Sequence, residues 1–216
     1  MRVKICGIRN EKELEAAARS GADAVGFLVG QVHPSGDFIL PGTAARLVRH
    51  LPPGITPVIV THLTEPEEIL EIVDRTGIMT LQLHGGSTPE QVVQLRSALP
   101  PAAKLIVMLH LTSENDFEKA SDFFSSADAF LSDTFDAESG RVGGTGKTHD
   151  WELVRRFRDY SRLPVILAGG LGPDNVAEAI RTVHPYAVDA NSHLKTGDGV
   201  DAALCAAFVA AARSAQ

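Results

Sequence analysis

Three observations predict that this sequence folds as an α/β protein, a single (β/α)8 barrel of the TIM type. Short apolar segments rich in β-branched residues alternate eight times with longer helical patterns. The short segments are apolar throughout rather than at every second residue, which is typical of parallel strands buried on both faces. The length of 216 residues fits one barrel of this kind. An open, doubly wound parallel sheet is the alternative, because closure leaves no mark on a single sequence.

Each strand is expected to precede a helix. The strands are expected over residues 3–6, 24–29, 56–61, 79–83, 104–109, 129–132, 164–168 and 187–190. The helices are expected over residues 11–20, 43–50, 65–75, 89–99, 114–125, 150–160, 173–182 and 200–212. Thr64 and Thr88 each stand shortly before a proline and an acidic residue, which indicates capped helix starts. No linker or change of composition divides the chain, so we expect one domain over residues 1–216.

Composition excludes several classes of function. The net charge of −7 argues against a broad basic surface, so no nucleic-acid partner is expected. The first residues contain no long apolar run, and we therefore expect neither a signal peptide nor a membrane partner. Cys6 and Cys205 are too few for a disulfide framework or a zinc site. We expect a cytoplasmic protein that is a monomer or a homodimer.

Three glycine-rich segments follow the last three predicted strands. They are GRVGGTGKTHDW after the sixth, LAGGLGPDNV after the seventh and VDANSHLKTGDG after the eighth. Glycine allows sharp turns and close approach to a ligand, and the free N–H groups at a helix start favour an anion. Phosphate sites of barrels commonly lie at this end of the strands. A plain tight turn is the alternative, but the three segments together predict a phosphorylated small-molecule ligand.

Two residues at predicted strand ends are candidates for proton transfer. Cys6 ends the first strand and Asp133 follows the sixth, so both are expected at the mouth of the barrel. A thiol near helix ends and cations has a lowered pKa and can act as a base, and a carboxylic acid can donate a proton. The alternatives are a buried small hydrophobe for Cys6 and a solvated surface acid for Asp133. Cys205 lies in the alanine-rich last helix and is expected only to pack.

Seven motifs together resemble a known family. They are KICGI, GADAVGF, LQLHG, LSDT, GGTGKTHDW and VILAGGLGPDNVAEAI followed by AVDANS, in this order over essentially the whole chain. The sequence is thereby similar to the phosphoribosylanthranilate isomerase family of tryptophan biosynthesis. The resemblance implies a (β/α)8 barrel and an aldose–ketose isomerase, an intramolecular oxidoreductase. Its reaction would be the Amadori rearrangement of N-(5-phosphoribosyl)anthranilate to 1-(2-carboxyphenylamino)-1-deoxyribulose 5-phosphate, with no cofactor and no metal.

The resemblance also implies roles for the candidate acid and base. Cys6 matches the family's general base and Asp133 its general acid. Asp133 would have to be protonated to open the sugar ring. Burial against Phe130 and Phe135 is expected to raise its pKa for that purpose.

The substrate-binding residues are likewise implied by the resemblance. Gln82 and His84 in LQLHG match a motif near the aromatic part of the substrate, although His84 could equally be a structural imidazole. Asp189 also matches, and a buried acid there could serve only to organise the loops. The phosphate is expected on backbone N–H groups of the glycine-rich loops, those of Gly144, Gly169, Gly170, Asn191 and Ser192.

The loop after the second strand departs from the family. Gly36 and Asp37 stand where the family has an arginine that pairs with the anthranilate carboxylate. An aspartate there would repel this carboxylate, which predicts weak activity on the anthranilate substrate or a substrate that lacks the group. Asp37→Arg is then expected to improve the anthranilate reaction. The candidates for a replacement cation are Arg9 and the histidines at the mouth.

Four histidines follow predicted strands or lie in the last loop: His62, His84, His110 and His193. Scattered, partly exposed histidines are the plainer interpretation. Convergence with Cys6 and Asp133 on one cavity, with a different substrate or a divalent metal, is the alternative. Because a fold transfers more safely than a reaction, two further functions stay open. They are an isomerase or epimerase of another sugar phosphate and a non-catalytic barrel that binds a phosphorylated ligand.

Overall fold

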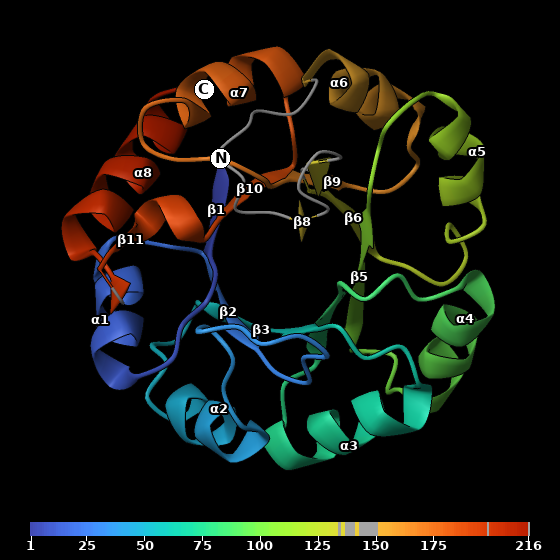
Figure 1. The fold of residues 1–216 in the computed structure, drawn as a ribbon, viewed down its shortest axis with the longest axis horizontal. Coiled ribbons are helices and arrows are strands. Elements are labelled where there is room, and N and C mark those ends of the chain that lie inside the picture. The colour runs from blue at the N-terminus through green and yellow to red at the C-terminus, as the bar shows by residue number, and fades with distance from the viewer. Residues whose placement is uncertain (134, 137–140, 143–150, 198, 216) are drawn as a thin grey trace.

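The computed structural model describes residues 1–133, 135–136, 141–142, 151–197 and 199–215, and these form a closed parallel barrel (Figure 1). The barrel strands are β1 (Arg2–Ile5), β2 (Ala24–Leu28), β3 (Thr56–Thr61), β4 (Thr80–Leu83), β5 (Lys104–Leu109), β6 (Ala129–Ser132), β9 (Val165–Leu167) and β10 (Ala187–Ala190). Their order around the barrel is β1-β10-β9-β6-β5-β4-β3-β2. Because β1 pairs with both β2 and β10, the sheet has no edge, which confirms the barrel and excludes the open sheet.

A helix follows each barrel strand and packs outside it. These are α1 (Glu11–Arg19), α2 (Pro41–Val48), α3 (Pro66–Thr76), α4 (Pro89–Ala98), α5 (Asn115–Ser121), α6 (Trp151–Tyr160), α7 (Val176–Val183) and α8 (Ala202–Ser214). Figure 1 shows them as a ring around the strands. Among the described residues, no helix has both the length and the apolarity to cross a bilayer. The helix-by-helix expectation is confirmed, with bounds that shift by a few residues.

The capped start of α4 agrees with the sequence expectation, whereas the starts of α3 and α7 differ from it. Thr88 caps α4, where it accepts a hydrogen bond from the N–H of Gln91 and the Gln91 side chain accepts one in return. At α3 the residue before the helix is Glu65, whose side chain makes no capping hydrogen bond, so the expected cap by Thr64 is wrong. α7 begins at Val176 rather than at 173, because the side chain of Asn175 bonds back to the preceding loop.

In the part of the chain that the structure describes, four short strands lie outside the barrel, and they were not expected. β7 (Phe135–Asp136) pairs with β8 (Arg141–Val142), and β11 (Lys195–Thr196) pairs with β12 (Gly199–Val200), both antiparallel. Strands of two residues are too short to show a periodic pattern in sequence. The two pairs of strands follow β6 and β10, respectively.

The strands are buried on both faces. The outward face packs on the helices and includes Val3, Ile5 and Phe130, while an inner cluster that includes Cys6 and Leu131 fills the barrel. This explains why the strands read as continuous apolar runs. Cys205 in α8 is fully buried in the outer layer, which confirms its packing role.

Candidate active site

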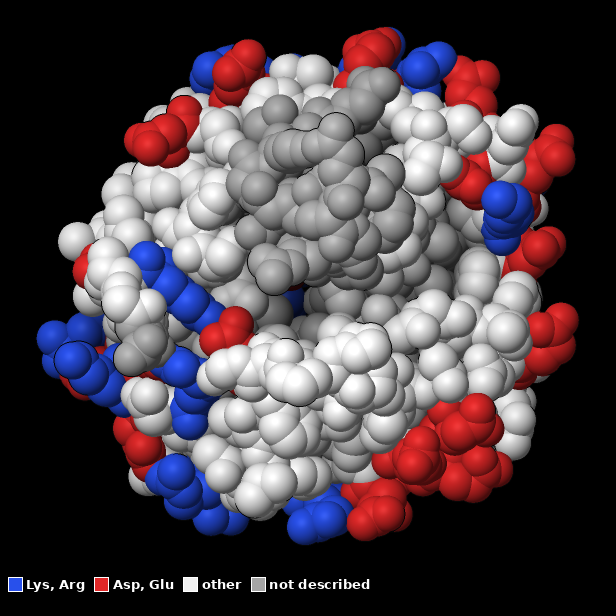
Figure 2. Space-filling view, viewed as in Figure 1, with Lys and Arg blue, Asp and Glu red and all other residues white. Residues whose placement is uncertain are grey.

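A cavity of about 740 Å³ opens at the carboxyl ends of the barrel strands. Figure 2 looks onto this face, with a hollow near the centre and many charged side chains along the outer edge of the molecule. The predicted site residues that line the cavity are Cys6, Gln82, His84, Asp133, Gly169, Gly170, Asn191 and Ser192. Gly144 lies outside the described residues.

Three buried ionisable groups lie together at the cavity, and two of them, Cys6 and Asp189, line it. The ammonium group of Lys4 on β1 donates a hydrogen bond of 2.7 Å to Asp189 Oδ2 on β10, and both side chains are nearly inaccessible to solvent. Lys4 also faces the thiol of Cys6, which lies two residues further along the chain, directly after β1. Burial by itself would lower the pKa of Lys4, but Asp189 and Cys6 outweigh it and the pKa is raised. Burial raises the pKa of Asp189, which Lys4 only partly offsets.

The expectation of a lowered thiol pKa is wrong for this structure. The pKa of Cys6 is raised to about 11, mainly by burial and in part by Asp189, while Lys4 acts in the opposite direction. The desolvation of a thiolate inside the barrel exceeds the attraction of the nearby ammonium group. Gly26 on β2 makes room for the pair, since a Cβ there would stand 2.6 Å from the Cys6 sulfur.

Lys4 is a functional candidate that the sequence interpretation missed. A usable signal was present, because Lys4 interrupts an apolar strand two residues before Cys6. Side chains two apart on a strand point to the same face, so an inward Cys6 implies an inward Lys4. A lysine inside a barrel needs an acidic partner, which here is Asp189.

The candidate acid lies beside a histidine. His84 Nε2 stands 3.6 Å from Asp133 Oδ2, and Gln82 Nε2 lies 3.0 Å from the other ring nitrogen of His84. Burial lowers the pKa of His84 to about 3, and His62, Lys4 and His110 contribute, so this imidazole is neutral at neutral pH. A neutral ring held by Gln82 can present its second nitrogen to Asp133.

Phe130 does not surround Asp133 as expected. Its ring packs on the outer face of β6 against Phe157, with ring centroids 5.6 Å apart. Asp133 instead lines the cavity on the inner side. The side chain of Phe135 lies outside the described residues.

The turn after β9 has the backbone geometry expected of an anion site. Gly169 and Gly170 have φ values of 81° and 65°, the left-handed region that glycine adopts without strain. Asn175 fixes the turn by accepting from the N–H of Gly172 and donating to the carbonyl of Gly170. Ser192 begins a short 3₁₀ helix, Ser192–Leu194, at the neighbouring strand end. Both segments line the same side of the cavity.

Asp37 is paired rather than free. Its carboxylate forms an ion pair with Lys195 and accepts a hydrogen bond of 3.0 Å from Asn191 Nδ2. Both partners come from the loop after β10, which closes over Gly7, where a Cβ would lie 2.5 Å from Asn191 Oδ1. The charge of Asp37 is thus balanced by Lys195, so the expected repulsion of an anthranilate loses its basis.

Arg9 does not line the cavity. Its guanidinium group is bound to the carboxylate of Glu13, with a shortest contact of 2.6 Å, and it also donates to the carbonyl of Gly36. This arginine ties α1 to the loop after β2. The sequence suggested Arg9 or the histidines at the mouth as a replacement cation. In the structure, histidines line the cavity and Arg9 does not.

Some of the four predicted histidines converge. The rings of His62 and His84 stack with centroids 5.4 Å apart, and His33 meets the His62 ring edge-on at 6.3 Å. All three line the cavity, and His33 had not been expected there. His193 is exposed and lies over Gly172 instead. Within the described part of the chain, no group of three His, Cys, Asp or Glu residues is arranged to hold a metal ion.

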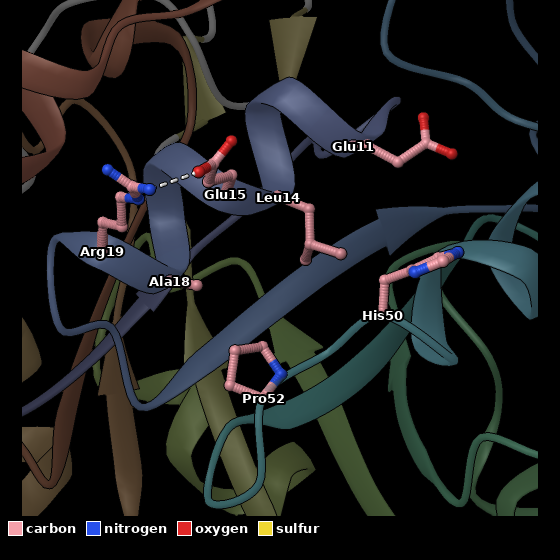
Figure 3. Close-up of a pocket in the computed structure, with 7 residues that line it drawn as sticks. All are labelled: Glu11, Leu14, Glu15, Ala18, Arg19, His50 and Pro52. Carbon is pink, nitrogen blue, oxygen red and sulfur yellow. Dashed lines mark ion pairs between the residues drawn. The ribbon is translucent and has the colours of Figure 1, made fainter.

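A second hollow lies on the outside of the barrel (Figure 3). It has a volume of about 420 Å³ and runs between α1 and the segment after α2, with Glu11, Arg19 and His50 on its walls. Glu15 and Arg19 pair with each other across one helical turn. None of the residues at the barrel mouth contributes to it, so we exclude it as the active site.

A closed barrel with a thiol, a carboxyl group and a glycine turn around one cavity is the arrangement of a (β/α)8-barrel enzyme. The family model described as N-(5'phosphoribosyl)anthranilate (PRA) isomerase matches residues 3–211. The chain belongs to this family.

Individual relatives agree with this assignment. N-(5'-phosphoribosyl)anthranilate isomerase 2 of Methanosarcina mazei is 44% identical over 199 residues, which are 92% of this chain and 88% of the relative. The crystal structure of phosphoribosyl anthranilate isomerase from Thermotoga maritima matches with a TM-score of 0.86 and 35% identity, covering 99% of each chain. A third match has a TM-score of 0.83, 32% identity and 99% coverage of both chains. It is a phosphoribosyl anthranilate isomerase in complex with reduced 1-(o-carboxyphenylamino)-1-deoxyribulose 5-phosphate.

Proposed function

We propose that this chain catalyses the Amadori rearrangement of N-(5-phosphoribosyl)anthranilate in tryptophan biosynthesis. The product is 1-(2-carboxyphenylamino)-1-deoxyribulose 5-phosphate. The observation that carries the proposal is that Cys6 and Asp133 line one cavity together with the glycine turn after β9. The catalytic unit is the single barrel domain of residues 1–216, and we assign the activity to the cytoplasm.

Asp133 is the general acid for ring opening. In its protonated form it donates to the ring oxygen of the sugar, the bond between this oxygen and C1 breaks, and the nitrogen lone pair forms a Schiff base. The neighbouring ring nitrogen of His84, at 3.6 Å, supports this step by orienting the carboxyl group. Gln82 in turn fixes the orientation of the His84 ring.

Cys6 is the general base for the second step. Its thiolate takes the proton from C2 of the opened sugar, and the resulting enolamine tautomerises to the ketone. With a pKa of about 11, the thiol of the ligand-free protein holds its proton at neutral pH. Lys4 favours the thiolate by its charge, so loss of the proton depends on this neighbour. Activity is therefore expected to rise with pH above neutrality.

The substrate lies across the mouth between these groups. Its phosphate binds to the backbone of Gly169, Gly170, Asn191 and Ser192, which suits a protein with no broad basic surface. β10 is four places from β4 around the ring of strands, and β9 is four places from β3. A substrate whose phosphate lies at β9 and β10 therefore extends its aromatic end toward β3 and β4.

The test is an assay of the purified protein with freshly prepared phosphoribosylanthranilate, in which loss of substrate fluorescence reports turnover. Cys6→Ser and Asp133→Asn are each expected to reduce kcat by at least ~100-fold, because each removes a proton-transfer group. Cys205→Ser is the matched control, since Cys205 lies in the packing layer outside the barrel.

Two observations complete this test. Circular dichroism and thermal melting are expected to show that both variants fold. The alkaline rise in activity should be lost in Cys6→Ser, because the titrating thiol is gone. A folded Cys6 or Asp133 variant with near-normal kcat would remove that residue from the mechanism.

A further inference from the structure

The anthranilate carboxylate needs a partner in this cavity. A buried carboxylate without a hydrogen-bonded or charged partner is costly, so a site that accepts the substrate must supply one. Among the described residues that line the cavity there is no lysine or arginine. Arg9 is held by Glu13, and Lys195 is held by Asp37 next to the phosphate side.

The topology places this missing partner at the ends of β3 and β4. These strands lie opposite β9 and β10, where the phosphate is proposed to bind, with Cys6 and Asp133 between the two sides. In Figure 2 the rim between the central hollow and helices α2 and α3 consists mainly of side chains other than Lys, Arg, Asp and Glu.

Three imidazoles form a row at this position. His33 comes from the loop after β2, His62 from the end of β3 and His84 from the end of β4. Their ring centroids are 6.3 Å and 5.4 Å apart, and the rings of His62 and His84 are tilted by only 16°. Gly85 lets the β4 loop approach closely, because a Cβ there would stand 2.1 Å from the carbonyl oxygen of His62. The three imidazoles of the row thus come from three separate loops and together form this part of the cavity wall.

We propose that His33 and His62 bind the carboxylate of the anthranilate group and thereby determine specificity for an aromatic acid. The inference rests on the proposed function and adds the residues that recognise one end of its substrate. His84, which stacks on His62 and faces Asp133, supplies the wall behind the aromatic ring. In this chain the two histidines would take the role of the arginine that the family has in the loop after the second strand.

The charges around the row are consistent with this role. Among the described residues, the aromatic rings in contact with His62 are both imidazoles, His33 on one side and His84 on the other. His84 faces Asp133, with Gln82, His110 and Lys4 as its further polar neighbours. Burial lowers the pKa of His62, and the charge of His33 adds to this effect. An arriving carboxylate favours the protonated form, so binding is coupled to proton uptake.

The experiment compares two substrates that differ only in the carboxylate. Phosphoribosylanthranilate and the corresponding phosphoribosylamine of aniline are assayed with the wild type, His33→Gln and His62→Asn. Each variant is expected to raise KM for the anthranilate substrate by about 10- to 100-fold, as for a lost charge-assisted hydrogen bond. The kcat for this substrate and both constants for the aniline substrate should stay near the wild-type values. His50→Gln, in the outer hollow of Figure 3, is the matched control.

The possible outcomes separate this inference from the proposed function. Equal effects on the two substrates, or no effect, would overturn the carboxylate site while the isomerase activity stands. If KM for the anthranilate substrate rises selectively in Lys195→Met but not in the histidine variants, Lys195 binds the carboxylate. That result would also overturn the proposed site at His33 and His62. If the wild type turns over neither substrate, the proposed function itself is wrong and the inference goes with it.

Discussion

The two sides of the barrel mouth are built in different ways. The side at β9 and β10 is made from backbone, with two glycines at positive φ and a short 3₁₀ helix within consecutive loops. The side at β2, β3 and β4 is made from side chains, with imidazoles that meet from three loops. Backbone donors suit a phosphate common to many substrates, whereas side chains recognise the part that distinguishes one substrate from another. If His33 and His62 bind the carboxylate as proposed, specificity in this chain lies on the imidazole side.

The largest expected effect comes from a charge placed on the phosphate side. Gly170→Asp introduces a carboxylate at the turn, and we expect KM to rise at least ~100-fold through repulsion of the phosphate and loss of close approach. Gly170→Asn, of nearly the same shape at the same positive φ, controls for backbone strain and should raise KM much less. Titration calorimetry with ribose 5-phosphate measures the effect directly. Equal affinity of the wild type and the aspartate variant would place the phosphate elsewhere.

A smaller effect is expected from pH on ligand affinity, and it should depend on the carboxylate that binds at the imidazole side. Because the pKa of His62 is lowered in the free protein and rises against a carboxylate, binding takes up a proton and strengthens as pH falls. We expect affinity for the reduced carboxyphenylamino product analogue to increase about tenfold from about pH 8 to about pH 6. The analogue that lacks the carboxylate controls for titration of the phosphate. A ratio of the two dissociation constants that is independent of pH would contradict proton uptake by the row.

The smallest effect is expected at Asp37, which borders the two sides. The sequence alone predicts that Asp37→Arg improves the anthranilate reaction, but the ion pair with Lys195 changes this expectation. An arginine would stand against Lys195 and lose the hydrogen bond from Asn191, so kcat/KM should fall by about 3- to 10-fold. In Asp37→Asn, which keeps an acceptor for Asn191, kcat/KM should fall less. A gain in kcat/KM for Asp37→Arg would show that this loop binds the carboxylate.

The sequence was sufficient for the barrel because the evidence for it is local and repeated. Apolar runs such as those of β3 and β5 have the length and composition of buried strands wherever they stand. The residues at strand ends follow from the same argument, and Cys6 and Asp133 reach one cavity as expected. The helix and strand bounds shift where a side chain such as Asn175 bonds to a nearby turn.

What could not be predicted depends on pairs of residues far apart in sequence. The partner of Asp37 is Lys195, and the stacking of His62 on His84 joins two separate loops. The pKa of Cys6 likewise depends on burial inside a closed barrel, which a single sequence does not measure. Lys4 is the exception, since alternation along β1 would have placed it beside Cys6.

The central claim is that the phosphate and the carboxylate bind on opposite sides of the mouth. A crystal structure of this protein with reduced 1-(o-carboxyphenylamino)-1-deoxyribulose 5-phosphate tests it most directly. We predict the phosphate on the turn of Gly169 and Gly170 and the carboxylate within hydrogen-bonding distance of His33 or His62. A carboxylate bound to Lys195 or Arg9, or a phosphate at the ends of β3 and β4, would contradict the account.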